Sequence, residues 1–134
     1  MKRREFILAA AGGVLLPKLG LAAQGGWIDY KPEVIQSLLD EGKTVFVDYH
    51  AVWCSTCKAQ RRVVERLRAE NPAYDAAMEF VNVDWDEYAR HPVSTDRAIP
   101  RRSTLLVLRG TKELGRIVAG TSESEIKALL DAGL

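Results

Sequence analysis

The stretch VDYHAVWCSTCKAQ, from Val47 to Gln60, decides how this chain folds. It begins inside residues 44–51, an apolar run rich in β-branched and aromatic residues that is typical of a buried strand. The two cysteines of the 134-residue chain follow, Cys54 and Cys57. Apolar residues then recur with helical spacing up to Ala69. The stretch therefore predicts a strand, a turn that carries both cysteines, and a helix over 55–69.

Elements on both sides of this stretch complete one domain. We expect helices at 32–43 and 123–134, and strands at 78–86, 103–110 and 115–120. Ser122 is the expected N-cap of the last helix, with Glu125 at the capping-box position. The order α-β-α-β-α-β-β-α predicts an α/β domain whose sheet is flanked by helices.

Composition and charge are those of an ordinary globular domain. Hydrophobic residues make up 47% of the chain and charged residues 28%, and the formal net charge is +1. A protein that binds nucleic acid would present a strongly basic face, so we expect no nucleic-acid partner.

The first 23 residues have the three parts of a cleavable export signal. A basic start is followed by the apolar run Phe6–Leu16 and then by small residues. This run is shorter than the roughly 20 residues that a membrane anchor needs. Arg3 and Arg4 precede it as in signals of the twin-arginine pathway, with the Sec pathway as the alternative. We therefore expect residues 24–134 to form the mature domain in the periplasm, an oxidising compartment.

The spacing of Cys54 and Cys57 favours thiol chemistry. Residues three apart are neighbours on a helix surface, so the two sulfurs can close a disulfide with little backbone motion. The first cysteine lies at the helix N-terminus, where free amides and the helix dipole stabilise a thiolate. Cys54 is therefore the expected nucleophile, and Cys57 the thiol that resolves the mixed disulfide.

Two other uses of the cysteines are less favoured. A bridge that closes so short a loop removes little chain entropy, so a purely structural disulfide would stabilise the fold only slightly. A structural zinc site needs four ligands, and the two histidines, His50 and His91, are far apart in the sequence. We therefore expect no such metal site. Copper(I) held by two thiolates needs fewer ligands and stays as the non-enzymatic alternative.

The segment VDYHAVWCSTCKAQ resembles the active-site strand and turn of the thioredoxin superfamily, and the element order matches that fold. The resemblance covers Trp27 to Leu134. Over residues 27–58 the sequence is most similar to the periplasmic thioredoxin-like domain of the membrane disulfide reductase DsbD. The family implies a thioredoxin fold, with a central mixed four-stranded β-sheet flanked by helices and an additional N-terminal helix. It also implies a thiol:disulfide oxidoreductase.

The resemblance assigns roles to residues around the pair. Cys54 and Cys57 match the redox-active disulfide, and Trp53 matches the tryptophan beside it. Asp48 matches a buried acidic residue whose raised pKa suits it to take the proton of the resolving thiol, Cys57. His50 is expected to pack against the helix. The arginines of that helix are expected on its solvated side: Arg61, Arg62, Arg66 and Arg68.

The family carries a cis-proline before the third core strand, and here the sequence departs from it. Pro100 comes three residues early, so either Pro100 is the cis-proline or Ser103 replaces it. We favour Ser103, because two arginines would be poor residues for a central strand. The bond before Ser103 should then be trans. Its hydroxyl would face the sulfurs, and Arg101 and Arg102 would flank a groove that favours acidic partners.

These inferences predict an exported reductase or electron relay that acts on periplasmic proteins with disulfides or thiols. The expected substrate-binding residues are Trp53, Arg102, Ser103 and Thr104. The dipeptide Ser55-Thr56 adds no imidazole, so the potential should lie towards the reducing side. No glycine fingerprint for a nucleotide cofactor is present, so electrons would come from a membrane donor of the DsbD or CcdA type. We expect a monomer; a disulfide oxidase or isomerase is the alternative enzyme.

Overall fold

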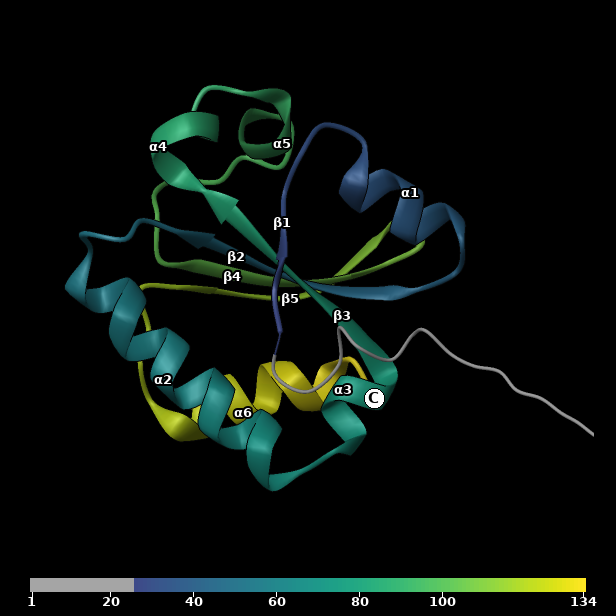
Figure 1. Ribbon diagram of the computed structural model, residues 1–134, viewed down its shortest axis with the longest axis vertical. Coiled ribbons are helices and arrows are strands. Elements are labelled where there is room, and N and C mark those ends of the chain that lie inside the picture. The colour runs from purple at the N-terminus through teal and green to yellow at the C-terminus, as the bar shows by residue number, and fades with distance from the viewer. Residues whose placement is uncertain (1–25) are drawn as a thin grey trace, which may run out of the picture.

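The computed structural model describes residues 26–134, which form a five-stranded mixed sheet with helices on both faces (Figure 1). The predicted export signal, residues 1–23, lies outside the described residues. The sheet has the order β1-β3-β2-β4-β5. β1, β3 and β2 are parallel, β4 is antiparallel to β2, and β5 is antiparallel to β4. The strands are β1 Ile28–Asp29, β2 Thr44–His50, β3 Met78–Asp84, β4 Thr104–Arg109 and β5 Lys112–Val118.

The helices divide between the two faces of the sheet. One apolar cluster joins the sheet to α1, α4 and α5, and the other joins it to α2, α3 and α6 (Figure 1). Along β2, Val45, Val47 and Tyr49 belong to the first cluster and Phe46 to the second. The helices are α1 Val34–Asp40, α2 Ser55–Glu70, α3 Ala73–Ala77, α4 Trp85–Tyr88, α5 Pro92–Thr95 and α6 Glu123–Ala132. Because both faces are covered, every residue of β2 is buried.

The predicted thioredoxin fold is confirmed, with differences at element ends and three short helices, α3, α4 and α5, that the sequence analysis did not predict. β1, a two-residue edge strand, makes the sheet five-stranded; so short a segment carries no alternation from which to predict it. β5 begins at Lys112 instead of residue 115, directly after a turn at Gly110 with a positive φ of 60°. The predicted N-cap is confirmed, because the Ser122 hydroxyl accepts a hydrogen bond from the Glu125 amide at 3.2 Å.

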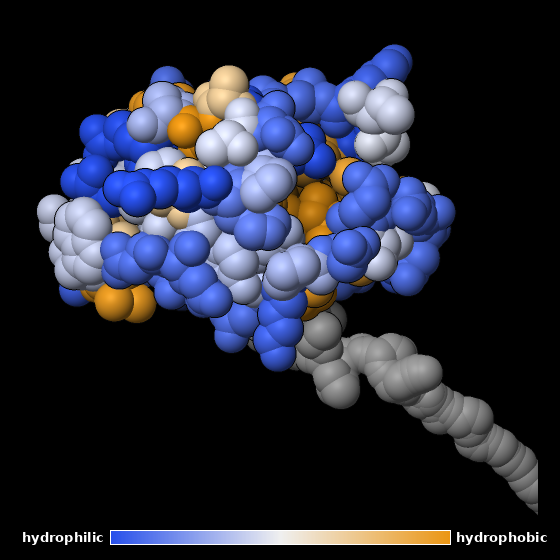
Figure 2. Space-filling model, turned by 90° about the horizontal axis from the view of Figure 1, so that it is seen from above, coloured by the Kyte–Doolittle hydropathy of each residue, from blue (hydrophilic) through white to orange (hydrophobic). Residues whose placement is uncertain are grey.

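The outer surface is mostly polar. Figure 2 shows that the end of the molecule seen from above is largely hydrophilic, with apolar residues in small separate spots. Within residues 26–134 no helix is long and apolar enough to cross a membrane. The large hydrophobic side chains that stay exposed in the described part are Val52, Trp53, Val118 and Leu134.

The prediction that the four arginines of α2 lie on its solvated side is wrong for two of them. Arg61 turns towards the sheet, and Arg68 is only 4% exposed. Arg68 follows Val64 by one turn, so it lies on the inner face of the helix and its side chain crosses the Phe80 ring at 3.6 Å. Its Nε donates to Asp75 Oδ1 at 2.6 Å, and Nη2 donates to a backbone carbonyl. Arg62 and Arg66 are exposed as predicted.

Arg68→Ala should destabilise the fold far more than Arg66→Ala. Removing Arg68 takes a buried cation from Asp75 and from the face of Phe80, which should lower the free energy of unfolding by about 3 kcal/mol. Arg66 forms exposed ion pairs with Glu70 and Glu123, so its loss should cost less than about 1 kcal/mol. Urea unfolding of both variants checks this; equal effects would contradict a structural role for Arg68.

Candidate active site

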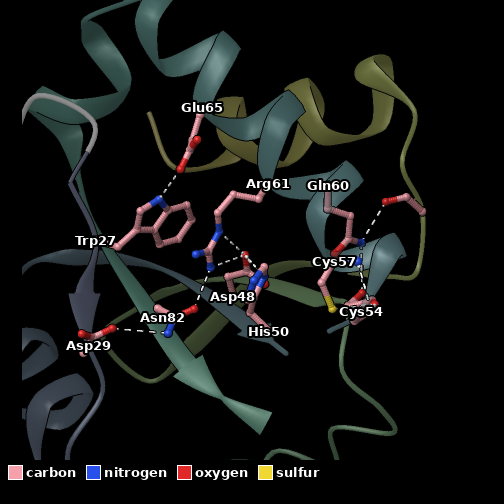
Figure 3. A network of polar contacts seen from close by, with 12 residues as sticks. Trp27, Asp29, Asp48, His50, Cys54, Cys57, Gln60, Arg61, Glu65 and Asn82 are labelled. Atoms are coloured by element: carbon pink, nitrogen blue, oxygen red, sulfur yellow. Dashed lines mark hydrogen bonds and ion pairs between the residues drawn. The ribbon is translucent and has the colours of Figure 1, made fainter. Parts of the chain in front are cut away.

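The two cysteines lie at the start of α2, directly after the end of β2. Cys54 is the N-cap residue, and its Sγ accepts a hydrogen bond from the Cys57 amide at 3.1 Å. Cys57 is in the first turn of the helix. Both are buried free thiols, 3% and 0% exposed (Figure 3). The backbone amide therefore stabilises negative charge on Cys54, as its place at the helix N-terminus predicts.

Ser103 faces both sulfurs. Its Oγ lies 3.2 Å from Cys54 Sγ and 3.1 Å from Cys57 Sγ. Among residues 26–134 no peptide bond is cis, so the bond before Ser103 is trans, and Pro100 is exposed. The register that aligns Ser103 with the family's proline is thus the one observed, and β4 begins at the next residue.

The backbone of Ser103 is held in an unusual conformation. Its φ is +66°, in the left-handed region that residues with a side chain rarely adopt. Its N–H donates to the Tyr49 carbonyl at 2.7 Å, and its own carbonyl accepts from Ala119 N at 2.8 Å and Gln60 Nε2 at 3.0 Å. Residues from β2, α2 and the end of β5 therefore fix the hydroxyl beside the sulfurs.

The two thiols are made chemically unequal by these surroundings. Burial of Cys54 disfavours its thiolate, but hydrogen bonds from the Cys57 thiol, the Ser103 hydroxyl and the Cys57 amide outweigh burial and lower its pKa from 9.0 to about 7. Burial and the hydrogen bond to Cys54 raise the pKa of Cys57. Cys54 is thus ionised first and suits the role of nucleophile, whereas Cys57 needs a base.

Asp48 lies under the same helix. Its side chain is fully buried on β2, as the sequence predicts, and burial raises its pKa from 3.8 to about 6 against the opposing charge of Arg61. Arg61 donates to Asp48 Oδ2 from Nη2 at 2.7 Å and from Nε at 3.1 Å. Sequence reasoning missed this partner. Its spacing is the signal that was available, because Arg61 follows Cys57 by four residues and so shares its helix face.

His50 is also close to Asp48. Its side chain is mostly buried, as expected for packing, and Nδ1 lies 3.8 Å from Asp48 Oδ2. Burial and the nearby charge of Arg61 lower the pKa of His50 to about 4, so the ring is neutral at pH 7. Among the described residues no group of three or more His, Cys, Asp or Glu side chains is placed to hold a metal ion.

The predicted substrate-binding residues divide into exposed and buried ones. Trp53 is 57% exposed next to Cys54, its Nε1 donates to the Asp86 carboxylate at 3.0 Å, and the Arg102 guanidinium lies 4.7 Å from its ring. Thr104 is fully buried in β4, and its hydroxyl donates to the Arg101 carbonyl at 2.7 Å. Its side chain therefore supports the loop that leads to Ser103.

Comparison with known proteins shows similarity to thioredoxins. The family model described as Thioredoxin matches residues 29–132. The chain belongs to the thioredoxin family. It is 29% identical to Thioredoxin-1 of Saccharomyces cerevisiae over 96 residues, 72% of this chain and 86% of that protein. It is 32% identical to Thioredoxin-2 of the same yeast, over 71% and 85% of the two chains. The crystal structure of Trxlp from Edwardsiella tarda superposes with a TM-score of 0.65 at 26% identity, over 76% and 97% of the two chains.

Membership of this family gives the dithiol its chemistry. With Cys54 and Cys57 at the strand-to-helix turn, the chain is a thiol:disulfide oxidoreductase of the thioredoxin type. A thioredoxin with serine facing the sulfurs has a hydroxyl where proline offers only carbon atoms. Ser103 can therefore donate a hydrogen bond to a thiolate, which proline cannot do.

Ser103→Ala should raise the pKa of Cys54. A hydrogen bond to a charged group contributes about 1.5 kcal/mol or more, so its loss should move the pH midpoint of Cys54 alkylation up by about 1 unit. Iodoacetamide rates between pH 5 and 9 measure this. Ser55→Ala, an exposed serine next to Cys54, is the matched control and should keep the midpoint of the unmodified protein. An unchanged midpoint in Ser103→Ala would remove the hydroxyl from thiolate stabilisation.

Proposed function

We propose that this thioredoxin is an exported reductase or electron relay, which reduces disulfides of periplasmic proteins through Cys54 and Cys57. The observation that carries the proposal is the environment of Cys54. Its pKa of about 7 makes a good share of the thiol reactive at neutral pH, without the strong thiolate stabilisation that makes a dithiol oxidising. Ser55 and Thr56 add no positive charge to shift that balance.

The reaction proceeds in two exchanges. The Cys54 thiolate attacks one sulfur of a client disulfide, which forms a mixed disulfide and releases the other client sulfur as a thiolate. Asp48 then takes the proton of Cys57, and the Cys57 thiolate attacks Cys54 Sγ. This breaks the mixed disulfide and releases the second client thiolate. Two electrons have passed from the dithiol to the client, and Cys54 and Cys57 are joined.

The surface around Cys54 suits a protein client. Val52 and Trp53 are exposed directly before it, and exposed Val118 pairs across the sheet with Thr104, the neighbour of Ser103. Three of the four exposed large hydrophobic side chains in residues 26–134 are thus neighbours of site residues in sequence or lie beside them in the sheet. Arg102 adds positive charge beside Trp53. An extended client segment with apolar and acidic residues fits this rim.

Other features support export and a membrane electron donor. The basic, apolar and small-residue parts of 1–23 support export, with Arg3 and Arg4 favouring the twin-arginine pathway. The similarity of residues 27–58 to the periplasmic domain of DsbD supports a membrane donor of the DsbD or CcdA type. The oxidised pair would return to the dithiol by exchange with that donor.

The Cys57→Ala variant tests the function. It should reduce insulin at less than about 1% of the rate of the unmodified protein with dithiothreitol as donor, since mixed disulfides on Cys54 cannot resolve. Expressed in the periplasm, it should accumulate covalent partners that dithiothreitol releases, whereas Cys54→Ala should trap none. Faster oxidation of reduced ribonuclease than reduction of insulin would favour the oxidase alternative. Stoichiometric copper(I) binding without trapped partners would favour the metal-binding one.

Replacing Arg3 and Arg4 by lysines tests the route of export. On the twin-arginine route the paired arginines are required, so the variant should stay in the cytoplasm as the uncleaved precursor. Cell fractionation and the mass of the protein measure this. A variant exported and cleaved like the unmodified protein would assign the signal to the Sec pathway. If the unmodified protein and the variant both kept the mass of the full-length precursor, export would be refuted.

A further inference from the structure

The guanidinium of Arg61, the cation paired with Asp48, is in contact with three residues from different parts of the fold. Arg61 extends from α2 between Trp27 and Asp48 (Figure 3). Besides its two hydrogen bonds to Asp48 Oδ2, its Nη2 donates to Asn82 Oδ1 at 2.7 Å. Asn82 lies opposite Asp48 on β3, and its own amide reaches Asp29 on β1 at 3.4 Å. Strands β2 and β3 therefore fix the position of the guanidinium.

Trp27 covers the ion pair on the remaining side. Its ring lies 4.0 Å from the Arg61 guanidinium carbon, and its Nε1 donates to Glu65 at 2.9 Å. The same ring packs edge-on against Phe46 and Phe80. With the arginine side chain only 19% exposed and Asp48 fully buried, little water screens their interaction. The attraction between the two charges is therefore less screened than in an ion pair on the surface.

The two oxygens of Asp48 have different surroundings. Oδ2 accepts both hydrogen bonds from Arg61. Oδ1 is buried, and among residues 26–134 no side chain or backbone group donates to it. A buried carboxylate oxygen without a donor is costly and is a ready acceptor for a proton. Arg61 and Cys57 project from one face of α2, one turn apart, over the strand that carries Asp48.

We propose that Arg61 is a positioning residue for the resolving step: it holds Asp48 through Oδ2 as a carboxylate and leaves Oδ1 to take the proton of Cys57. This inference rests on the proposed function of Asp48 as the base. The proton moves from Cys57 Sγ to Asp48, the new thiolate attacks Cys54 Sγ, and the client sulfur leaves with the bonding pair. Without Arg61 a carboxyl group buried this deeply would keep its proton at neutral pH and accept none.

Other charged groups near Asp48 do not replace Arg61. From α2, Glu65 acts in the opposite direction and raises the pKa of Asp48. From β2, His50 is neutral at pH 7 because burial lowers its pKa. Asp29 of β1 is negative and reaches the site through Asn82. Arg61 is therefore the cation that opposes burial of the carboxylate.

The test separates the two exchanges with one equivalent of an aromatic disulfide, bis(nitrobenzoate) disulfide, whose released thiolate is coloured. The first release reports attack by Cys54, and the second reports resolution by Cys57. In Arg61→Met the first release should keep its rate, and the second should slow about tenfold at pH 7. The pH midpoint of the second release should move up by about 1 unit or more in Arg61→Met, because an opposite charge at this distance lowers a carboxyl pKa by about that much. The slow step should recover at higher pH.

Matched variants guard against a purely structural effect. Arg62→Met removes an exposed arginine from the next position of α2 and should leave both releases unchanged. Arg61→Lys keeps the positive charge, so the pH midpoint of its second release should lie close to that of the unmodified protein. The titration of the Asp48 carboxyl carbon, followed by carbon-13 NMR in the reduced proteins, should move up in Arg61→Met and stay in Arg62→Met.

The outcomes distinguish this inference from the proposed function. A second release in Arg61→Met with the unmodified pH profile, while Asp48→Asn slows it, would overturn the role of Arg61 and leave the reductase intact. An unmoved Asp48 titration in Arg61→Met would overturn it as well. A second release that Asp48→Asn does not slow would remove the base on which the inference rests. If the unmodified protein released no second thiolate, the proposed function itself would fail.

Discussion

The burial of β2 on both faces is the constraint on which the rest of this structure depends. The strand pairs with β3 on one side and β4 on the other, and helices cover it above and below. Any polar residue on it is therefore kept from water and needs a partner. Asp48 has that partner in Arg61, and the end of the same strand leads directly to the turn with Cys54. Strand β2 thus holds a buried carboxylate under α2 and leads directly to the two thiols at the start of that helix.

The site has two levels, one around the sulfurs and one around the Asp48 carboxylate. At the upper level Cys54, Cys57 and Ser103 share short contacts, and the hydroxyl is close to both sulfurs. At the lower level Asp48 and Arg61 are held by β3 and covered by Trp27. The first turns of α2 connect the levels, because Cys57 and Arg61 are four residues apart. Movement of this helix end would affect both levels together.

Serine at the position of the family's proline changes what the fold must hold in place. A cis bond before a residue other than proline costs about 2.5 to 4 kcal/mol, and here the bond is trans. Ser103 takes a positive φ instead, which three backbone contacts stabilise. The sulfurs consequently face a hydroxyl group held by strained backbone. Strain of this kind persists where the surrounding structure enforces it, and here β2, α2 and the end of β5 do so.

Local patterns in the sequence predicted helices α1, α2 and α6, four of the five strands and the cysteine pair at a strand-to-helix turn, because apolar spacing and residue chemistry act within a few neighbours. The resemblance to thioredoxins supplied the roles of Asp48 and Ser103. Helices α3, α4 and α5 were not predicted, because four or five residues are too few to show a helical period. The two-residue strand β1 was not predictable, since it exists only through its pairing with β3. The inward turn of Arg61 and Arg68 was also decided by the tertiary structure. A charged residue at the edge of a helix face looks solvated in sequence, and only the partners that folding brings near, Asp48 on β2 and Asp75 on α3, make its burial favourable. The contact between the Trp27 ring and Arg61 was likewise decided by the tertiary structure: the two residues lie far apart in the chain, and Trp27 directly precedes β1, which pairs with β3.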